Sequence, residues 1–180
     1  TSSLFPIDNR GIVMKKWSFI YAILLCVVLL TACNDQAPEI VIEATISPVS
    51  AEEYKNIGAT KDLSEPKQED FKIFEFDFDM EHTNSVKERK IDMYNFENLK
   101  QALNEIDGNS RYWYGSWSSQ DNESENFATY DQEFVFYAKG LSDDDIKQAF
   151  SNEKIMVSWT NYNNEQIKKE YNLSDLIKFN

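Results

Sequence analysis

The sequence is short of positive charge. Lysine and arginine together number 18, against 31 aspartate and glutamate residues, so the formal net charge at pH 7 is −13. Proteins that bind nucleic acid present a basic patch to the phosphates, and an anionic membrane surface repels an acidic domain. The composition therefore argues against nucleic acid as a partner, and it favours solubility and attraction to cations or cationic peptides.

Histidine, cysteine and glycine are also scarce, with one, two and five residues respectively. His82, the single histidine, could act as a general base or a metal ligand, but it has no histidine partner and stands in a polar segment. No serine lies in a Gly-x-Ser-x-Gly motif, which disfavours serine hydrolase chemistry. We therefore expect His82 to be an ordinary loop residue.

The long apolar run of the chain lies near its beginning. Lys15 and Lys16 precede residues 17–30, which are apolar or small and are interrupted only by Ser18. A membrane-spanning helix needs about 20 apolar residues, so this run is short for a permanent span. A basic segment followed by such a run is typical of a secretory signal peptide.

The run ends in Leu30-Thr31-Ala32-Cys33, and polar residues follow. This order closely resembles the lipobox of bacterial lipoproteins. The resemblance implies that the signal peptide is cut before Cys33, that Cys33 receives a diacylglycerol, and that the protein is held on the extracytoplasmic face of the cell membrane. Two acyl chains suffice for stable anchoring, because each buried methylene contributes about 0.8 kcal/mol. Cys26 would leave with the signal peptide, so no thiol would remain for disulfides, zinc binding or catalysis.

We divide the chain into four parts on these grounds. Residues 1–13 are expected to be an upstream extension, 14–32 the signal peptide, 33–70 a lipidated tether with one strand, and 71–180 a globular β-rich domain. The strand of the tether is predicted at 39–47, where alternating apolar residues stand between two prolines. The long loop expected after it favours a tether, since such loops are uncommon inside compact domains, but the pattern leaves open whether residues 39–47 belong to the domain.

Apolar periodicity predicts the remaining elements. Residues 71–80 alternate most clearly, with phenylalanines and Met80 on one face and Glu75, Asp77 and Asp79 on the other. Further strands are expected at 86–94, 111–118, 130–138, 154–160 and 165–172, and helices at 96–106 and 142–150. Clean alternation is typical of antiparallel sheets with one face in water. We therefore predict a mainly β, antiparallel, immunoglobulin-like sandwich with two short helices; the alternative is an α+β fold with both helices on one face of the sheet.

Three acidic groups are candidate sites: Glu75, Asp77 and Asp79 in the clearest strand; Asp121, Glu123 and Glu125 in a polar loop; and residues 143–145 at a helix start. Two carboxylates about 7 Å apart on a strand overlap the geometry of glycosidases, but a solvated strand face explains them more simply. The loop group lacks the glycine and spacing of an EF-hand, and acids at 143–145 complement the helix dipole. We predict no metal and no cofactor.

The aromatic segment 111–118 is the candidate ligand platform. Strict alternation would place Trp113 and Trp117 on one face and Tyr112 and Tyr114 on the other. One face is expected in the core, and the other could stack against a sugar or a peptide. The favoured alternative is that both faces pack in or partly in the core.

No catalytic motif stands out, so the favoured function is a non-enzymatic binding or accessory domain of the cell envelope, anchored by lipid and contacting a protein or glycan. The alternatives are a small extracytoplasmic hydrolase that uses carboxylates and His82, and an acidic inhibitor or immunity-type protein that occupies a cationic partner.

Overall fold

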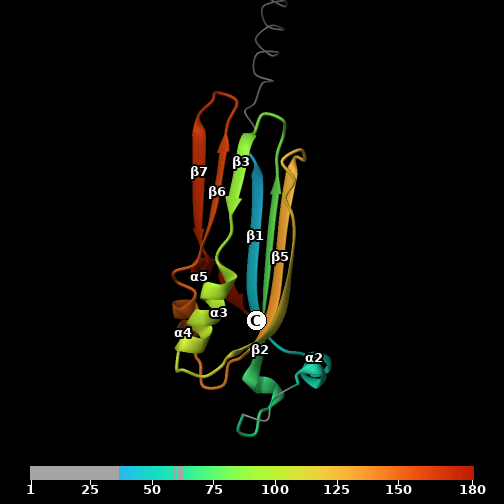
Figure 1. Cartoon of the computed structure of the whole chain (residues 1–180), viewed down its shortest axis with the longest axis vertical. Coiled ribbons are helices and arrows are strands. Elements are labelled where there is room, and N and C mark those ends of the chain that lie inside the picture. Colours follow the sequence, from blue (N-terminus) through green and yellow to red (C-terminus); the bar gives the residue numbers. More distant parts are fainter. Residues whose placement is uncertain (1–36, 59, 61–62) are drawn as a thin grey trace, which may run out of the picture. The chain divides into compact units, whose positions relative to one another are not determined.

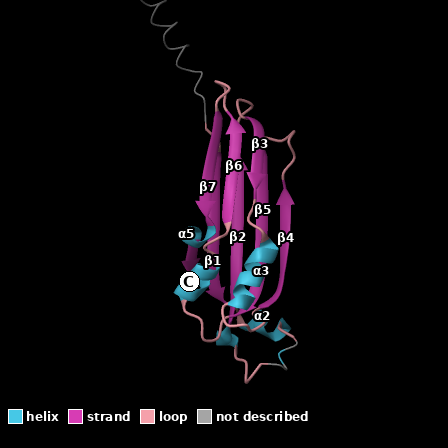
Figure 2. Ribbon diagram, turned by 60° about the vertical axis from the view of Figure 1, so that its left-hand side comes forward, coloured by secondary structure: helices cyan, strands magenta, loops and turns pink. Residues whose placement is uncertain are grey.

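Two β-sheets of unequal size enclose the hydrophobic core of this protein. The computed structural model describes residues 37–58, 60 and 63–180, and Figures 1 and 2 show the smaller sheet lying against one face of the larger. The predicted signal peptide and the lipidation site Cys33 lie outside the described residues. Within the described part, no helix is long and apolar enough to cross a membrane.

The larger sheet has five strands in the order β4-β5-β2-β1-β8. These strands are β1 (Glu39–Pro48), β2 (Phe71–Glu81), β4 (Tyr112–Gln120), β5 (Phe127–Tyr137) and β8 (Ile177–Phe179). All neighbouring strands run antiparallel except β1 and β8, which are parallel. The long strand β2 therefore lies at the centre, and β4 forms one edge (Figure 2).

The smaller sheet and the helices share one face of the larger sheet. The smaller sheet is antiparallel and contains β3 (Lys87–Asp92), β6 (Lys154–Thr160) and β7 (Gln166–Asn172), with β6 in the middle. Below it in Figure 1 lie α3 (Phe96–Glu105), α4 (Asp143–Ala149) and α5 (Leu173–Leu176). On the opposite face, a smaller apolar cluster lies beside α2 (Ala51–Asn56) and the 3-10 turn η2 (Gln68–Asp70).

The alternation of β2 decides which face of the larger sheet is buried. Its large apolar side chains Phe74, Phe76, Phe78 and Met80 are fully buried, whereas the acidic residues between them are exposed. The core that they enter also contains Ile155, Val157 and Trp159 of β6, Leu99 and Leu103 of α3, and Ile146 of α4. We call the buried side of the larger sheet the inner face and the other side the outer face.

The predicted fold class is confirmed. The protein is mainly β, its strand pairs are antiparallel apart from β1 and β8, and its helices are few and short. The two helices expected from the apolar stripe and the capping box are α3 and α4, and α4 begins with the predicted box between Ser142 and Asp145. The further helices α2 and α5 have only six and four residues.

The structure corrects the predicted tether. The segment 39–47 was expected within a tether that ended at residue 70, but β1 pairs along its length with β2 and also with β8. Its side chains Ala44 and Ile46 are completely buried in the main core. The domain therefore includes β1, and the connection from β1 to β2 contains α2 and η2.

A buried arginine joins α3 to the strands that follow it. Arg111 precedes β4, and its guanidinium donates two hydrogen bonds to the carboxylate of Asp107, at 3.0 and 2.6 Å. It also donates to the carbonyl oxygen of Tyr137 at 2.8 Å, at the end of β5. Because a buried guanidinium needs partners for its donors, this arrangement fixes where β4 begins relative to β5.

Replacing Asp107 by asparagine tests this connection. The hydrogen bonds from Arg111 lower the pKa of Asp107 from 3.8 to about 2, so the carboxylate stabilises the fold at pH values above its ordinary pKa. Because the carboxylate is partly exposed, we expect Asp107→Asn to cost about 1 kcal/mol at pH 7. The difference should disappear as the pH falls through about 4 toward 2. Urea denaturation at several pH values measures it, with the exposed loop variant Glu123→Gln as control; a constant difference down to pH 2 would contradict the assignment.

Trp159 provides a test of the packing between the two sheets. Its side chain is 3% exposed and lies in the main core, as its phase with Ile155 and Val157 predicts. We expect Trp159→Ala to cost roughly 3–5 kcal/mol, the range for truncation of a buried large aromatic residue. Tyr162, which is 67% exposed in the turn after β6, gives the matched control, and Tyr162→Ala should change the free energy of unfolding by less than about 0.5 kcal/mol. Denaturant unfolding of both variants decides between these values.

Candidate functional site

The aromatic strand β4 contains an irregularity that alternation alone does not reveal. The pairing with β5 passes from Tyr112 opposite Phe136 to Tyr114 opposite Val135, so β4 has one extra residue at Trp113. A bulge of this kind turns the following side chains to the other face. The prediction that Trp113 and Trp117 share a face is therefore wrong: Trp113 packs on the outer face, and Trp117 lies opposite Gln132 on the inner face.

Glycine is required just after this irregularity. A Cβ atom on Gly115 would lie 2.5 Å from the Cβ atom of Phe134 and would also collide with the carbonyl oxygen of Glu133. The backbones of β4 and β5 can approach closely here only because Gly115 has no side chain. Gly115 also leaves the inner face of β4 without a side chain between Tyr112 and Trp117.

The four predicted platform residues have different surroundings. Tyr112 packs against Phe96 and Phe134, with ring centroids 5.5 and 5.9 Å apart, and extends the main core. Trp113 packs edge-on against Phe71 and donates its indole N–H to the carbonyl oxygen of Gly58 at 2.9 Å, so it has a structural role. Tyr114 is 40% exposed and Trp117 is 71% exposed. Trp117 is thus the member of the set most available to a ligand.

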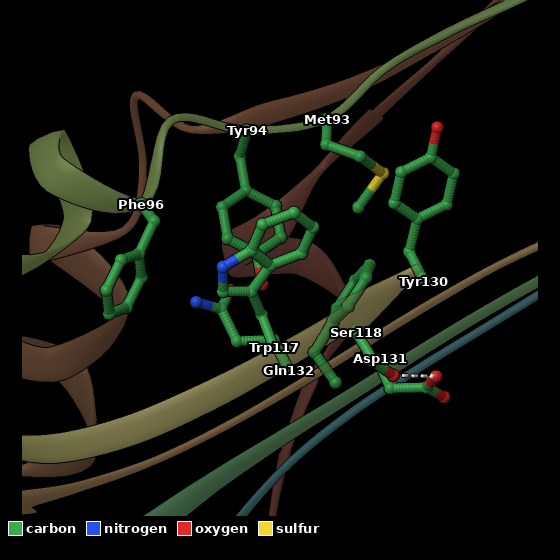
Figure 3. Close-up of a pocket in the computed structure, with 9 residues that line it drawn as sticks. Met93, Tyr94, Phe96, Trp117, Ser118, Tyr130, Asp131 and Gln132 are labelled. Carbon is green, nitrogen blue, oxygen red and sulfur yellow. Dashed lines mark hydrogen bonds between the residues drawn. The ribbon is translucent and has the colours of Figure 1, made fainter. Parts of the chain in front are cut away.

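Trp117 forms one wall of an open apolar pocket of about 230 Å³ (Figure 3). The other apolar walls come from three separate stretches of the chain and comprise Phe76, Met93, Tyr94, Phe96 and Tyr130. In Figure 3, Met93, Tyr94, Phe96 and Trp117 point toward a common space above β5. The sequence did not predict that these residues line one pocket. Met93 and Tyr94 belong to the link between β3 and α3, and they meet β4 only in the folded chain.

The hydroxyl groups of the pocket are already hydrogen-bonded. Tyr94 donates to the side-chain oxygen of Gln132, and Tyr130 donates to the carboxylate of Asp121 at 2.6 Å. Burial raises the pKa of Tyr94, with a further contribution from Glu153, and burial together with Asp121 raises the pKa of Tyr130. Both phenols therefore stay protonated at neutral pH. The pocket offers aromatic surface to an apolar group rather than a group that exchanges protons.

The outer face of the larger sheet is strongly acidic. Its exposed carboxylates are Glu39, Glu43, Glu75, Asp77, Asp79, Glu81, Asp131 and Glu133. The four long strands of this sheet contain a single basic residue, Lys72. Its ammonium group pairs with Asp143 of α4 and not with the carboxylates of the outer face. A hollow of about 370 Å³ lies on this face beside β4, where Ser116 and Ser118 adjoin Asp131 and Glu133.

Burial and the crowding of carboxylates on this face raise the pKa of Asp77. Asp77 stands directly opposite Asp131 in the β2–β5 pairing. Loss of water around the carboxylate of Asp77 raises its pKa, and the negative charges of Asp131, Asp79 and Glu75 raise it further. Like charges held this close favour the approach of a cationic group. Within residues that the structure describes, however, no group of three or more histidine, cysteine or acidic side chains is placed to hold a metal ion.

The remaining sequence-level candidates take part in local structure. His82 donates from Nδ1 to the carbonyl oxygen of Thr83 and accepts at Nε2 from Arg89, both at 2.9 Å. The guanidinium of Arg89 also donates to the carboxylate of Asp121 and to the carbonyl oxygens of Asn122, Glu125 and Phe127, in and just after the loop between β4 and β5. Arg89 therefore fixes the position of the loop that contains the acidic group Asp121, Glu123 and Glu125. Asp145 completes the capping box of α4 with Ser142.

Comparison of the chain with protein-family models, with curated proteins and with solved structures finds no match in any of the three.

Proposed function

We propose that this protein is a lipid-anchored extracytoplasmic domain that binds a protein or glycan of the bacterial cell envelope and catalyses no reaction of its own. The observation that carries the proposal is the open aromatic pocket at Trp117. Trp and Tyr dominate binding surfaces because they give a large contact area for little loss of conformational entropy. Trp117 is 71% exposed and adjoins an apolar pocket, and contiguous exposed apolar surface is typical of interaction sites.

The size of the pocket indicates what it holds. Sites for drug-sized ligands occupy about 300–1,000 Å³, whereas a cavity of about 150 Å³ is enough for a benzene ring. The pocket at Trp117, at about 230 Å³, therefore suits one apolar side chain or one sugar face and not a whole cofactor. This favours recognition of one anchor group of a larger partner.

Replacing Trp117 tests this proposal. Because the indole is exposed, Trp117→Ala should leave the free energy of unfolding within about 1 kcal/mol of wild type while binding falls by about tenfold or more, the loss typical of a hot spot. Tyr162→Ala, at an equally exposed aromatic residue away from the pocket, is the control. The immobilised protein is offered detergent-solubilised envelope proteins and, separately, purified peptidoglycan. Retention of an unchanged set of components by Trp117→Ala would refute a role for the pocket.

The acidic outer face favours a second candidate, the inhibitor or immunity-type protein. Such a protein would cover a cationic surface with its own carboxylates rather than fill the pocket. Under that function, the double variant Asp77→Asn/Asp131→Asn would lose its partner and Trp117→Ala would keep it. The same capture experiment therefore separates the two functions.

The anchor itself is tested at Cys33. The lipobox resemblance implies that Cys33 is acylated before the signal peptide is removed. Cys33→Ala should therefore abolish incorporation of labelled palmitate and should leave uncleaved precursor or release the domain from the membrane. Cys26→Ala is the matched control, since Cys26 would leave with the signal peptide, and it should label like wild type. Equal labelling of wild type and Cys33→Ala, or no label in wild type, would contradict the anchor.

A further inference from the structure

The edge strand β4 has an open side. It pairs only with β5 in the order of the larger sheet, and residues 114–120 are all exposed. In the described part of the chain, no backbone hydrogen bond links these residues to anything except β5. Alternate N–H and C=O groups of an edge strand point away from its neighbour, so this stretch presents a row of groups that a further strand could pair with.

The other sheet edges are protected in ways that β4 is not. Natural sheets protect their edges with charge or with short strands, among other means. The strand β8 has three residues, β3 carries four charges in its first four positions, and β7 contains Lys168, Lys169 and Glu170. By contrast, the nine residues of β4 include no charged residue and no proline. The contrast within one molecule indicates that the open edge of β4 is used.

Two hollows of opposite chemistry flank this edge. The apolar pocket lies on the inner face beside Trp117 (Figure 3). The acidic hollow lies on the outer face beside Ser116 and Ser118. Successive side chains of a strand point to opposite faces, so a strand paired with β4 would direct alternate side chains toward the two hollows. Apolar side chains would meet the pocket, and the residues between them would meet the carboxylates.

Small side chains on β4 leave the carboxylates within reach of the edge. Asp131 and Glu133 stand opposite Ser118 and Ser116 in the β4–β5 pairing. Neighbouring strands are about 5 Å apart, so an added strand would lie about 10 Å from β5. A lysine or arginine on that strand can extend its long stem over the serines and bring its charge toward Asp131 and Glu133.

The charge of the protein decides between the occupants of this edge. A second copy of the chain would bring the same carboxylates beside those already present, and each copy carries a formal charge of −13. Like charges opposite one another oppose pairing, whereas a basic segment would be attracted to this face. The occupant favoured by charge is therefore a cationic segment of another protein.

We propose that β4 binds, by strand addition, an extended segment of a partner protein in which apolar residues alternate with lysine or arginine. This assignment rests on the proposed binding function and specifies its partner. Main-chain hydrogen bonds to the edge would supply affinity, and the pocket and the carboxylates would select the alternating pattern.

The test uses synthetic peptides and the full chain in a non-ionic detergent. The probe is the capped peptide Val-Lys-Val-Lys-Val-Lys-Val, and binding is followed by isothermal titration calorimetry. The first matched peptide has the same composition with the four valines placed before the three lysines. The second keeps the alternating order but carries N-methyl groups on alternate amides of the edge that would pair, which removes those donors.

We expect the alternating peptide to bind and both matched peptides to bind at least tenfold more weakly. The double variant Asp131→Asn/Glu133→Gln should also weaken binding by about tenfold, with less dependence on salt, as expected for removal of facing charges. Thermal melting of the variant shows whether it is folded, and the N-methylated peptide tests strand pairing on the wild-type protein in any case.

Other results would overturn the proposal. Equal binding of the block-ordered or N-methylated peptide would mean attraction without strand pairing. A concentration-dependent dimer that is abolished by Ser118→Pro would mean that a second copy occupies β4. If no peptide binds while Trp117→Ala still loses its envelope component in the capture experiment, strand addition is refuted and the proposed binding function stands.

Discussion

The alternation of aromatic and acidic residues along β2 is the constraint on which the rest of the structure depends. Phe74, Phe76 and Phe78 are buried, and the acids between them cannot follow them into the core without a large desolvation cost. The inner face therefore has to be covered, and the smaller sheet and helices α3, α4 and α5 cover it (Figure 1). The outer face has to remain in water for most of its length. The acidic residues that alternate with the buried phenylalanines of β2 therefore stay on this face and give it its negative charge.

The chemistry of the edge strand β4 depends on the same sheet. β5 continues the alternation, with Phe134 and Phe136 inside and Asp131 and Glu133 outside, so it gives β4 an apolar side and an acidic side. The bulge at Trp113 and the close approach at Gly115 then set β4 so that Trp117 faces inward beside the pocket. Trp113 packs with Phe71 in the small apolar cluster of the outer face and so has a structural role. Trp117 is not part of that cluster.

Much of the fold could be predicted, because the signals that define it are local. The period of two in β2 and β6, the apolar stripe of α3 and the capping box of α4 all depend on neighbours within a few residues, and each element was placed within a few residues of its observed bounds. The tether was predicted wrongly for the opposite reason. Whether β1 pairs with β2 depends on contacts across the loop that contains α2, and local pattern cannot distinguish a paired strand from an extended tether.

The sequence by itself determined the alternation of the strands, the excess of negative charge and the resemblance to a lipobox that ends at Cys33, because each depends only on residue types and their spacing. The tertiary structure alone decided which aromatic residues meet. The register between β4 and β5 separated Trp113 from Trp117, and the packing of the β3–α3 link brought Met93 and Tyr94 to the same pocket. The physical reason is that a single extra residue in one strand reverses every side chain after it, and its position is set by the partner strand and by the space that Gly115 leaves.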